Sequence, residues 1–340
     1  MLRLIAALAA ITASALGMAS HAGAQTTLKF AHIFPASHYL WEQAGKVFTE
    51  AVTARTNGRV KFEVYPAGQL GKDYLALLKS GIADIAIIVP SYAADKFPLT
   101  SVAELPGLYG SSCEGTSKFW NVVKDGAQLN DAEYKNQGLH VLFASVLPPY
   151  QVMTSSKRVE RLEDLSGLKL RANGVAMDKT IRALGSVSVR IPAPEFFEAL
   201  SRGTVDGGFY PYSGLASYRL EKVLRNSVTG VQLGAGSVVF AMSDRVWTTL
   251  PADIKNAMNG AATSTQANLC KWQDDEEKEV QAKLSAEGGH QVVVLGPQEA
   301  ARWQDRVNTV TTDWGKEMDG VGKNGTALLK SFRDARGDGS

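Results

Sequence analysis

Hydrophobic and polar positions follow two successive series of strand and helix patterns along this chain. In the first series, alternating or continuous apolar positions predict strands at 28–33, 60–65 and 85–89, with helix-periodic stretches between them. The second series predicts strands at 168–171, 187–191 and 205–210, separated by helices at 177–184 and 194–201. Strands that alternate with helices are typical of α/β folds with a largely parallel sheet. The pattern therefore predicts two α/β lobes of similar design.

An interrupted strand lies between the two series. Residues 139–147 are apolar, Pro148 and Pro149 break the run, and it resumes at 151–154. Such a broken strand is expected where the chain passes from one lobe to the other, although a plain loop would give the same pattern. The stretch 251–287 predicts one helix of about 50 Å, longer than a single lobe, which would brace both lobes.

These elements give expected domain boundaries. Lobe I would comprise residues 25–147 plus about 235–275, and lobe II residues 148–234 plus about 276–335. The second part of lobe II would hold a strand at 291–295 and a helix at 297–318. The Gly- and Asp-rich residues 336–340 are expected to form a disordered tail.

The first 24 residues have the layout of a secretory signal peptide. Arg3 precedes an apolar stretch from residue 4 to about 18, and Ala22-Gly23-Ala24 offers the small residues of a cleavage site. The apolar stretch is shorter than the roughly 20 residues that a membrane-spanning helix needs. We therefore expect cleavage before Gln25 and a periplasmic product.

Two cysteines, Cys113 and Cys270, lie in the exported part of the chain. In an oxidising compartment an even number of cysteines favours a disulfide, whereas two buried free thiols are the alternative. Sequence alone gives the parity of the cysteines but not the distance between them.

Composition and motifs argue against nucleic-acid binding and against familiar catalytic sites. Lys and Arg total 36 against 34 Asp and Glu, so the chain lacks the basic excess of a nucleic-acid-binding protein. It has no Cys-x-x-Cys, His-Glu-x-x-His, Walker A or Gly-x-Ser-x-Gly motif. His32 and His38 share a loop, but a metal site there would lack a third ligand nearby in sequence. A catalytic acid/base pair of Glu195 and Asp206 would rest on residue type alone. We expect no enzyme activity, no metal and no cofactor.

Arg171 is the strongest single candidate for ligand binding. It ends the predicted strand 168–171, and ligands of α/β proteins bind at the carboxyl ends of such strands. A guanidinium held there can bind a carboxylate through two parallel hydrogen bonds. A surface arginine is the alternative.

Several motifs together resemble one protein family, the periplasmic solute receptors of TRAP (tripartite ATP-independent periplasmic) transporters of the DctP type. The resemblance covers nearly all of the exported chain, in order and at the expected spacing. It is carried by Gly68-Gln69-Leu70-Gly71, Gly81-Ile82-Ala83-Asp84, Gly167-Leu168-Lys169-Leu170-Arg171, Gly203-Thr204-Val205-Asp206-Gly207 with Pro211, and Trp247-Thr248-Thr249-Leu250-Pro251.

The resemblance implies two α/β lobes joined by hinge strands and crossed by a long helix. Such receptors close over one small organic acid and deliver it to a two-subunit membrane permease, so we expect these partners, and a monomeric receptor. The family's arginine that pairs with the ligand carboxylate matches Arg171. A receptor that feeds a sensor kinase is the alternative, and a periplasmic hydrolase is a weaker one.

The resemblance also implies which residues face the ligand. Tyr210 occupies the position of a ligand-binding Asn in sialic-acid receptors, and Gln151 occupies that of a second arginine. The resemblance therefore favours a monocarboxylate, such as an aromatic or keto acid. Asn173 and the loop residue Gln69 are further polar candidates. The expected aromatic residues of the cleft are Phe34, Tyr92, Tyr150, Phe209 and Tyr212.

Overall fold

The computed structural model describes residues 25–335. The expected signal peptide at 1–24 and the expected tail at 336–340 lie outside these residues. Within the described part of the chain, no helix has the length and apolar character needed to cross a membrane.

The first sheet belongs to lobe I and has the strand order β2-β1-β3-β10-β4. β1, β2 and β3 are parallel, while β10 runs antiparallel to both β3 and β4. Every residue of β3 and β10 is buried, because helices cover both faces of the sheet. The strands are β1 (Thr26–Ala31), β2 (Val60–Tyr65), β3 (Ile85–Ile88), β4 (Leu139–Val146) and β10 (Ser237–Ser243).

The second sheet belongs to lobe II and has the order β11-β9-β5-β8-β6-β7. β6 is parallel to β7 and β8, and β5 is antiparallel to β8 and β9. The strands are β5 (Gln151–Thr154), β6 (Lys169–Ala172), β7 (Val187–Arg190), β8 (Gly207–Tyr210), β9 (Asn226–Thr229) and β11 (Gln291–Val294). The expected two-lobed α/β architecture is confirmed.

Helices surround both sheets, and the side chains at their starts help to fix them. Asp73 accepts a hydrogen bond from the Ala76 amide at the start of α3, and Ser111 accepts one from Glu114 at the start of α4. The helices are α2 (Lys46–Arg55), α3 (Tyr74–Ser80), α4 (Ser112–Val123), α5 (Val175–Ala183), α6 (Ala193–Ser201), α7 (Asp244–Thr249), α8 (Ala252–Ala286), α9 (Pro297–Gly320) and α10 (Gly325–Asp334).

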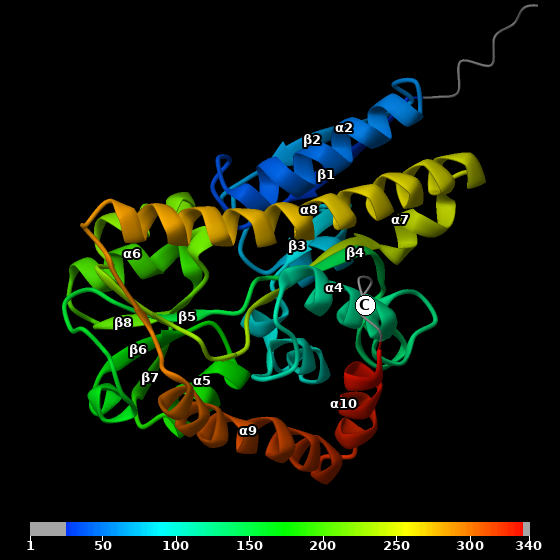
Figure 1. Cartoon of the computed structure of the whole chain (residues 1–340). Coiled ribbons are helices and arrows are strands. Elements are labelled where there is room, and N and C mark those ends of the chain that lie inside the picture. The colour runs from blue at the N-terminus through cyan, green and yellow to red at the C-terminus, as the bar shows by residue number, and fades with distance from the viewer. Residues whose placement is uncertain (1–24, 336–340) are drawn as a thin grey trace, which may run out of the picture.

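Helix α8 crosses both lobes, as its length predicts (Figure 1). It packs against α2 and β4 in lobe I and against the turn η7 (Tyr212–Gly214) in lobe II. Glu277 of α8 accepts hydrogen bonds from the amides of Tyr212 and Ser213, which fixes the helix to lobe II. Cys270 of α8 forms the predicted disulfide with Cys113 of α4, with the two Cα atoms 4.7 Å apart. The long helix is therefore attached to lobe I covalently and to lobe II by hydrogen bonds.

Two extended segments connect the lobes beside each other. Residues 147–150 lead from β4 to β5, and residues 230–236 lead from β9 to β10. The amides of Leu147 and Tyr150 donate to the carbonyls of Gly236 and Gly234, at 2.9 and 2.8 Å. The break predicted at Pro148-Pro149 thus lies within this connection.

The C-terminal helix returns to the first lobe. Figure 1 shows α9 running below lobe II toward α10 on the side of lobe I. α10 packs against α4 and the turn η3 (Leu99–Glu104), and Phe332 lies near Tyr109. The sequence-based boundary assigned residues 276–335 to lobe II, but α10 belongs to lobe I because its apolar face is buried there.

Candidate functional site

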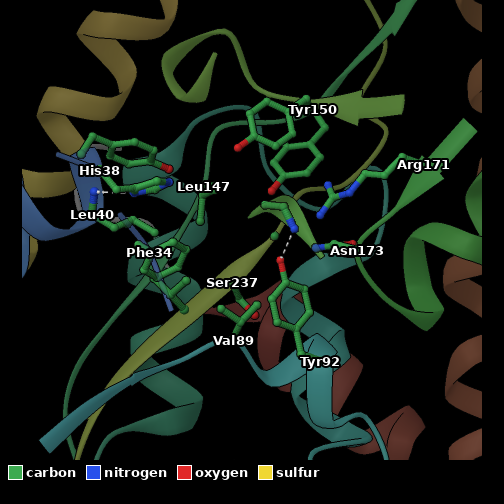
Figure 2. A pocket seen from close by; sticks show the side chains of 15 residues that line it. Phe34, His38, Leu40, Val89, Tyr92, Leu147, Tyr150, Arg171, Asn173 and Ser237 are labelled. Atoms are coloured by element: carbon green, nitrogen blue, oxygen red, sulfur yellow. Dashed lines mark hydrogen bonds between the residues drawn. The ribbon is translucent and has the colours of Figure 1, made fainter. Parts of the chain in front are cut away.

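A pocket lies between the two lobes beside the connecting segments. Its cavity volume is about 40 Å³. Lobe I, lobe II and the connections all contribute side chains (Figure 2). The lining residues are Phe34, His38, Tyr39, Leu40, Val89, Tyr92, Leu147, Tyr150, Arg171, Asn173, Ala193, Tyr210, Gly236, Ser237 and Val238. A ligand held here would contact both lobes at once.

Arg171 is the only cationic side chain of this lining apart from the titratable His38, and it is only 1% exposed. Its Nε donates to the carbonyl of Ile191 at 2.8 Å, and Nη1 lies 3.5 Å from the carbonyl of Phe209. The guanidinium lies over the rings of Phe196 and Tyr210, 5.5 and 5.7 Å from their centroids. Within residues 25–335 no carboxylate lies within 4.0 Å of it. A buried guanidinium without a carboxylate partner is prepared to bind an anion.

Tyrosine hydroxyls supply further hydrogen-bond donors around Arg171. The Tyr92 hydroxyl accepts from the Ala193 amide at 2.8 Å, so its own proton is free to be donated. Burial raises the pKa of Tyr92, Tyr150 and Tyr210, against the opposing effect of the Arg171 charge. All three phenols therefore remain protonated near neutral pH and can donate to a carboxylate oxygen.

A stack of rings forms the lobe I wall of the pocket. Phe34 stacks on His38 with centroids 4.4 Å apart, and His38 stacks on Tyr39 at 4.8 Å. The Nδ1 of His38 accepts a hydrogen bond from the Leu40 amide at 3.1 Å. Burial, helped by the nearby His32, lowers the pKa of His38 to about 3. The imidazole is therefore neutral, and this wall is uncharged and aromatic.

Among the described residues, no group of three or more His, Cys, Asp or Glu side chains is placed to hold a metal ion. His32 is buried between Phe34 and Trp41, and both of its ring nitrogens lack a hydrogen-bond partner. Burial lowers its pKa to about 4. The two histidines of this loop thus contribute neutral rings.

Six of the ten residues predicted for the site line this pocket: Phe34, Tyr92, Tyr150, Arg171, Asn173 and Tyr210. Asn173 is 8% exposed, and its side-chain oxygen has no hydrogen-bond partner. The six residues come from five different segments, which the two sheets and the connecting strands bring together.

The other four predicted residues lie outside the lining. Phe209 alternates with Tyr210 along β8, so it projects from the opposite face of the sheet. The Tyr212 hydroxyl is bonded to Ser227 at 2.6 Å. Gln69 is exposed in the turn after β2. Gln151 of β5 is buried and pairs with Tyr210 of the neighbouring strand β8. Its side-chain nitrogen donates to the Pro149 carbonyl, and its side-chain oxygen has no hydrogen-bond partner.

The sequence patterns missed several lining residues. His38 lies in the loop after β1, and Tyr39 and Leu40 begin the helix that follows this loop. Their position after a strand end was the available signal for them. Gly236 and Ser237 reach the pocket because the chain returns from lobe II and β10 pairs between β3 and β4 of the lobe I sheet. The expected boundary placed residues 235–275 in lobe I, but the pairing of β10 with β3 and β4 is a long-range contact for which periodicity gives no signal.

Comparison with known proteins agrees with this geometry. Residues 30–317 match the model of the family described as bacterial extracellular solute-binding protein, family 7, DctP. The chain belongs to this family. Its members are extracytoplasmic solute receptors, which are not enzymes. The chain is 28% identical to the C4-dicarboxylate-binding periplasmic protein DctP of Rhodobacter capsulatus, over 91% of this chain and 92% of that protein.

Two solved structures show the same two-lobed fold. A TRAP solute-binding protein from Rhodoferax ferrireducens, in complex with copurified benzoate, is 26% identical with a TM-score of 0.82, covering 91% of this chain and 97% of that one. A marine metagenome TRAP solute-binding protein specific for aromatic acid ligands, in complex with 3-hydroxybenzoate, is 25% identical with a TM-score of 0.84, covering 92% and 98%. The family resemblance inferred from the sequence is confirmed.

Proposed function

We propose that this protein is the extracytoplasmic receptor of a TRAP transporter for a small aromatic monocarboxylate, which it delivers chemically unchanged to a membrane permease. The observation that carries the proposal is the buried Arg171, which faces an aromatic pocket and has no carboxylate partner within residues 25–335. The carboxylate would bind the guanidinium and the hydroxyls of Tyr92 and Tyr150. The ring would lie between Phe34 and Tyr210.

The charge of the pocket favours one carboxylate over two. Arg171 is the only charged group of the lining, because His38 is neutral. A second carboxylate would be buried among rings without a counter-charge, at a cost of several kcal/mol. Gln151, which the family resemblance places at the position of a second arginine, is uncharged and lies outside the lining. The bound benzoate and 3-hydroxybenzoate of the two relatives support the same ligand class.

Ligand binding would couple to closure of the lobes. Ala193 of lobe II already donates to Tyr92 of lobe I, and the Tyr39 amide lies 3.4 Å from the Ser217 hydroxyl across the same boundary. A ligand that contacts both lobes stabilises the closed arrangement by its differential affinity for that state. The closed receptor would be the form that the permease recognises.

A binding panel tests the proposal. The mature protein would be unfolded, washed free of copurified ligand and refolded, and calorimetry would measure the affinities of benzoate, 3-hydroxybenzoate, succinate and benzamide. We expect the two aromatic acids to bind most tightly. Benzamide is the matched probe, because it keeps the ring and removes the negative charge. Tighter binding of succinate than of benzoate, or equal binding of benzamide and benzoate, would contradict the proposal. Conversion of a bound acid into a product would show an enzyme instead.

A further inference from the structure

His38 carries a hydrogen-bond donor that the proposed binding mode does not use. It lines the pocket from lobe I, and Figure 2 shows it on the opposite side of the pocket from Arg171 of lobe II. A ligand whose carboxylate binds Arg171 would direct the far side of its ring toward His38. A polar group at this end can recognise a substituent of the ring.

The backbone around His38 fixes which of its two ring nitrogens carries the proton. The His38 carbonyl accepts from the Glu42 amide at 3.0 Å, so His38 stands at the start of the helix that follows. Its Nδ1 accepts from the Leu40 amide at 3.1 Å, as the side chain of a helix N-cap does. A ring nitrogen that accepts a hydrogen bond has no proton of its own. The proton of the neutral imidazole is therefore on Nε2.

The same surroundings oppose a positive charge on this ring. The free amides at the start of a helix carry a partial positive charge, which disfavours a cation there. A second proton, on Nδ1, would point at the Leu40 N–H and break that hydrogen bond. Burial, together with the nearby His32, accordingly lowers the pKa of His38 to about 3. His38 is thus a neutral ring with one donor, Nε2–H.

The packing around the imidazole leaves its Nε2 edge for the pocket. Phe34 and Tyr39 both stack on it, with interplanar angles of 29° and 25°, and cover its two faces. The Leu40 amide covers the Nδ1 edge. Tyr218 of lobe II lies beside the ring, with centroids 5.1 Å apart, but its hydroxyl is buried without a hydrogen-bond partner. Because His38 still borders the pocket, the edge with Nε2 is the part that a ligand can reach.

The protein offers no acceptor for this donor. Within residues 25–335, the imidazole of His38 makes a hydrogen bond through Nδ1 but none through Nε2. An unsubstituted ring placed against this edge would cover Nε2–H and leave it without a partner, which is unfavourable for a desolvated donor. An oxygen on the far side of the ring would accept the hydrogen bond instead.

We propose that the ligand is an aromatic acid with an oxygen substituent on its ring, which accepts a hydrogen bond from Nε2–H of His38 while the carboxylate binds Arg171. This inference rests on the proposed function, because it takes the carboxylate to be bound at the guanidinium. The guanidinium selects the negative charge, and the imidazole selects the polar substituent. A ligand that satisfies both groups joins lobe I to lobe II and stabilises their closed arrangement.

Calorimetry with two matched pairs of acids tests the inference on the unmodified, ligand-free protein. The pairs are 3-hydroxybenzoate with 3-methylbenzoate and 4-hydroxybenzoate with 4-methylbenzoate. Hydroxyl and methyl groups have similar sizes, so each pair differs mainly in the presence of an acceptor. We expect one of the hydroxy acids to bind about tenfold or more tightly than its methyl partner, the effect of one buried hydrogen bond.

Two variants of His38 remove the donor in different ways. His38→Asn keeps an acceptor for the Leu40 amide but does not reach the position of Nε2. His38→Phe keeps an aromatic ring in the stack and has no donor. In both variants the hydroxy acid should lose its advantage, because its hydroxyl would be buried without a partner. His140 is the matched control, because it stacks on Trp247 outside the pocket lining, and His140→Phe should keep the wild-type preference.

The outcomes separate this inference from the proposed function. Methyl acids that bind as tightly as both hydroxy acids, together with tight binding of benzoate, would overturn the inference and leave the aromatic-acid receptor intact. A full preference for the hydroxy acid in both His38 variants, or its loss in His140→Phe, would assign the preference to another group and also overturn the inference. Failure of benzoate and of all four substituted acids to bind would overturn both proposals.

Discussion

Replacement of Arg171 by glutamine removes the only cation of the pocket and keeps a side chain that can donate a hydrogen bond. In the proposed complex the guanidinium gives the carboxylate two charge-assisted hydrogen bonds, each contributing about 1.5–3 kcal/mol. Loss of one partner of such a buried charged pair costs about 2–5 kcal/mol. We therefore expect the dissociation constant for benzoate to rise by roughly 30-fold to several thousand-fold in Arg171→Gln.

The free protein should tolerate this change, which makes the affinity measurement interpretable. Arg171 has no carboxylate within 4.0 Å in the described structure, so its removal breaks no ion pair and relieves a buried charge. Arg171→Lys should lie between wild type and Arg171→Gln, because it keeps the charge but loses the Nε donor to Ile191. Arg182→Gln, at an exposed arginine that pairs with Asp178, is the matched control.

Isothermal titration calorimetry with benzoate would be combined with thermal unfolding of each free variant. The reasoning is refuted if Arg171→Gln binds benzoate within about threefold of the wild type, a difference of less than 1 kcal/mol. It is also refuted if Arg182→Gln loses as much affinity as Arg171→Gln. A large fall in the melting temperature of the free Arg171→Gln protein would show that the arginine is structural.

Three further predictions concern other parts of the molecule. Replacement of Cys113 and Cys270 by serine opens a loop of 157 residues, and should lower the free energy of unfolding in urea by about 5 kcal/mol on the chain-entropy model. His38 stays neutral in the folded protein, whereas in the unfolded chain it takes up a proton below about pH 6.5. This difference should lower the free energy of unfolding by up to about 1.4 kcal/mol for each pH unit of acidification. His38→Asn should reduce this pH dependence of stability between about pH 6.5 and 4 in urea titrations. Gly236→Ala places a Cβ about 2.6 Å from the Tyr150 hydroxyl at the pocket wall, and should weaken benzoate binding by about tenfold or more in calorimetry.

Each of these predictions has an outcome that contradicts it. Alkylation of the unreduced, denatured protein would reveal free thiols if the disulfide were absent. An unchanged acid slope in His38→Asn would mean that other groups, such as His32, dominate the acid response. Wild-type benzoate affinity in Gly236→Ala would show that the ligand does not use this part of the pocket.

The positions that could be predicted from sequence are those that depend on local chemistry. The spacing of apolar residues in strands and helices predicted two α/β lobes, because burying one or both faces of an element requires apolar residues at regular intervals. The length of the apolar-periodic stretch before residue 287 predicted a helix that crosses both lobes, and α8 does so. Arg171 was identified by its place at a strand end together with the family motif that contains it.

The direction of each side chain separates the predicted aromatic residues that line the pocket from those that lie elsewhere. Tyr210 and Phe209 are adjacent, and only one of them can project toward the pocket because side chains alternate along β8. Tyr212 and Gln69 were predicted from loop position, but one is held by Ser227 and the other is exposed. Their motif placed them near the cleft without fixing the direction of their side chains.

The sequence alone determined the class of the protein, its two lobes, the helix that crosses both, the pairing parity of Cys113 and Cys270, and an arginine that lines the pocket between the lobes. Only the tertiary structure decided that β10 lies between β3 and β4, that α10 packs on lobe I, and that Ser237 hydrogen-bonds to Glu104 beside the pocket. The reason is physical. Periodicity and residue type indicate which face of a single segment is buried and which is exposed to water. Pockets and buried charges instead depend on which distant segments pack together.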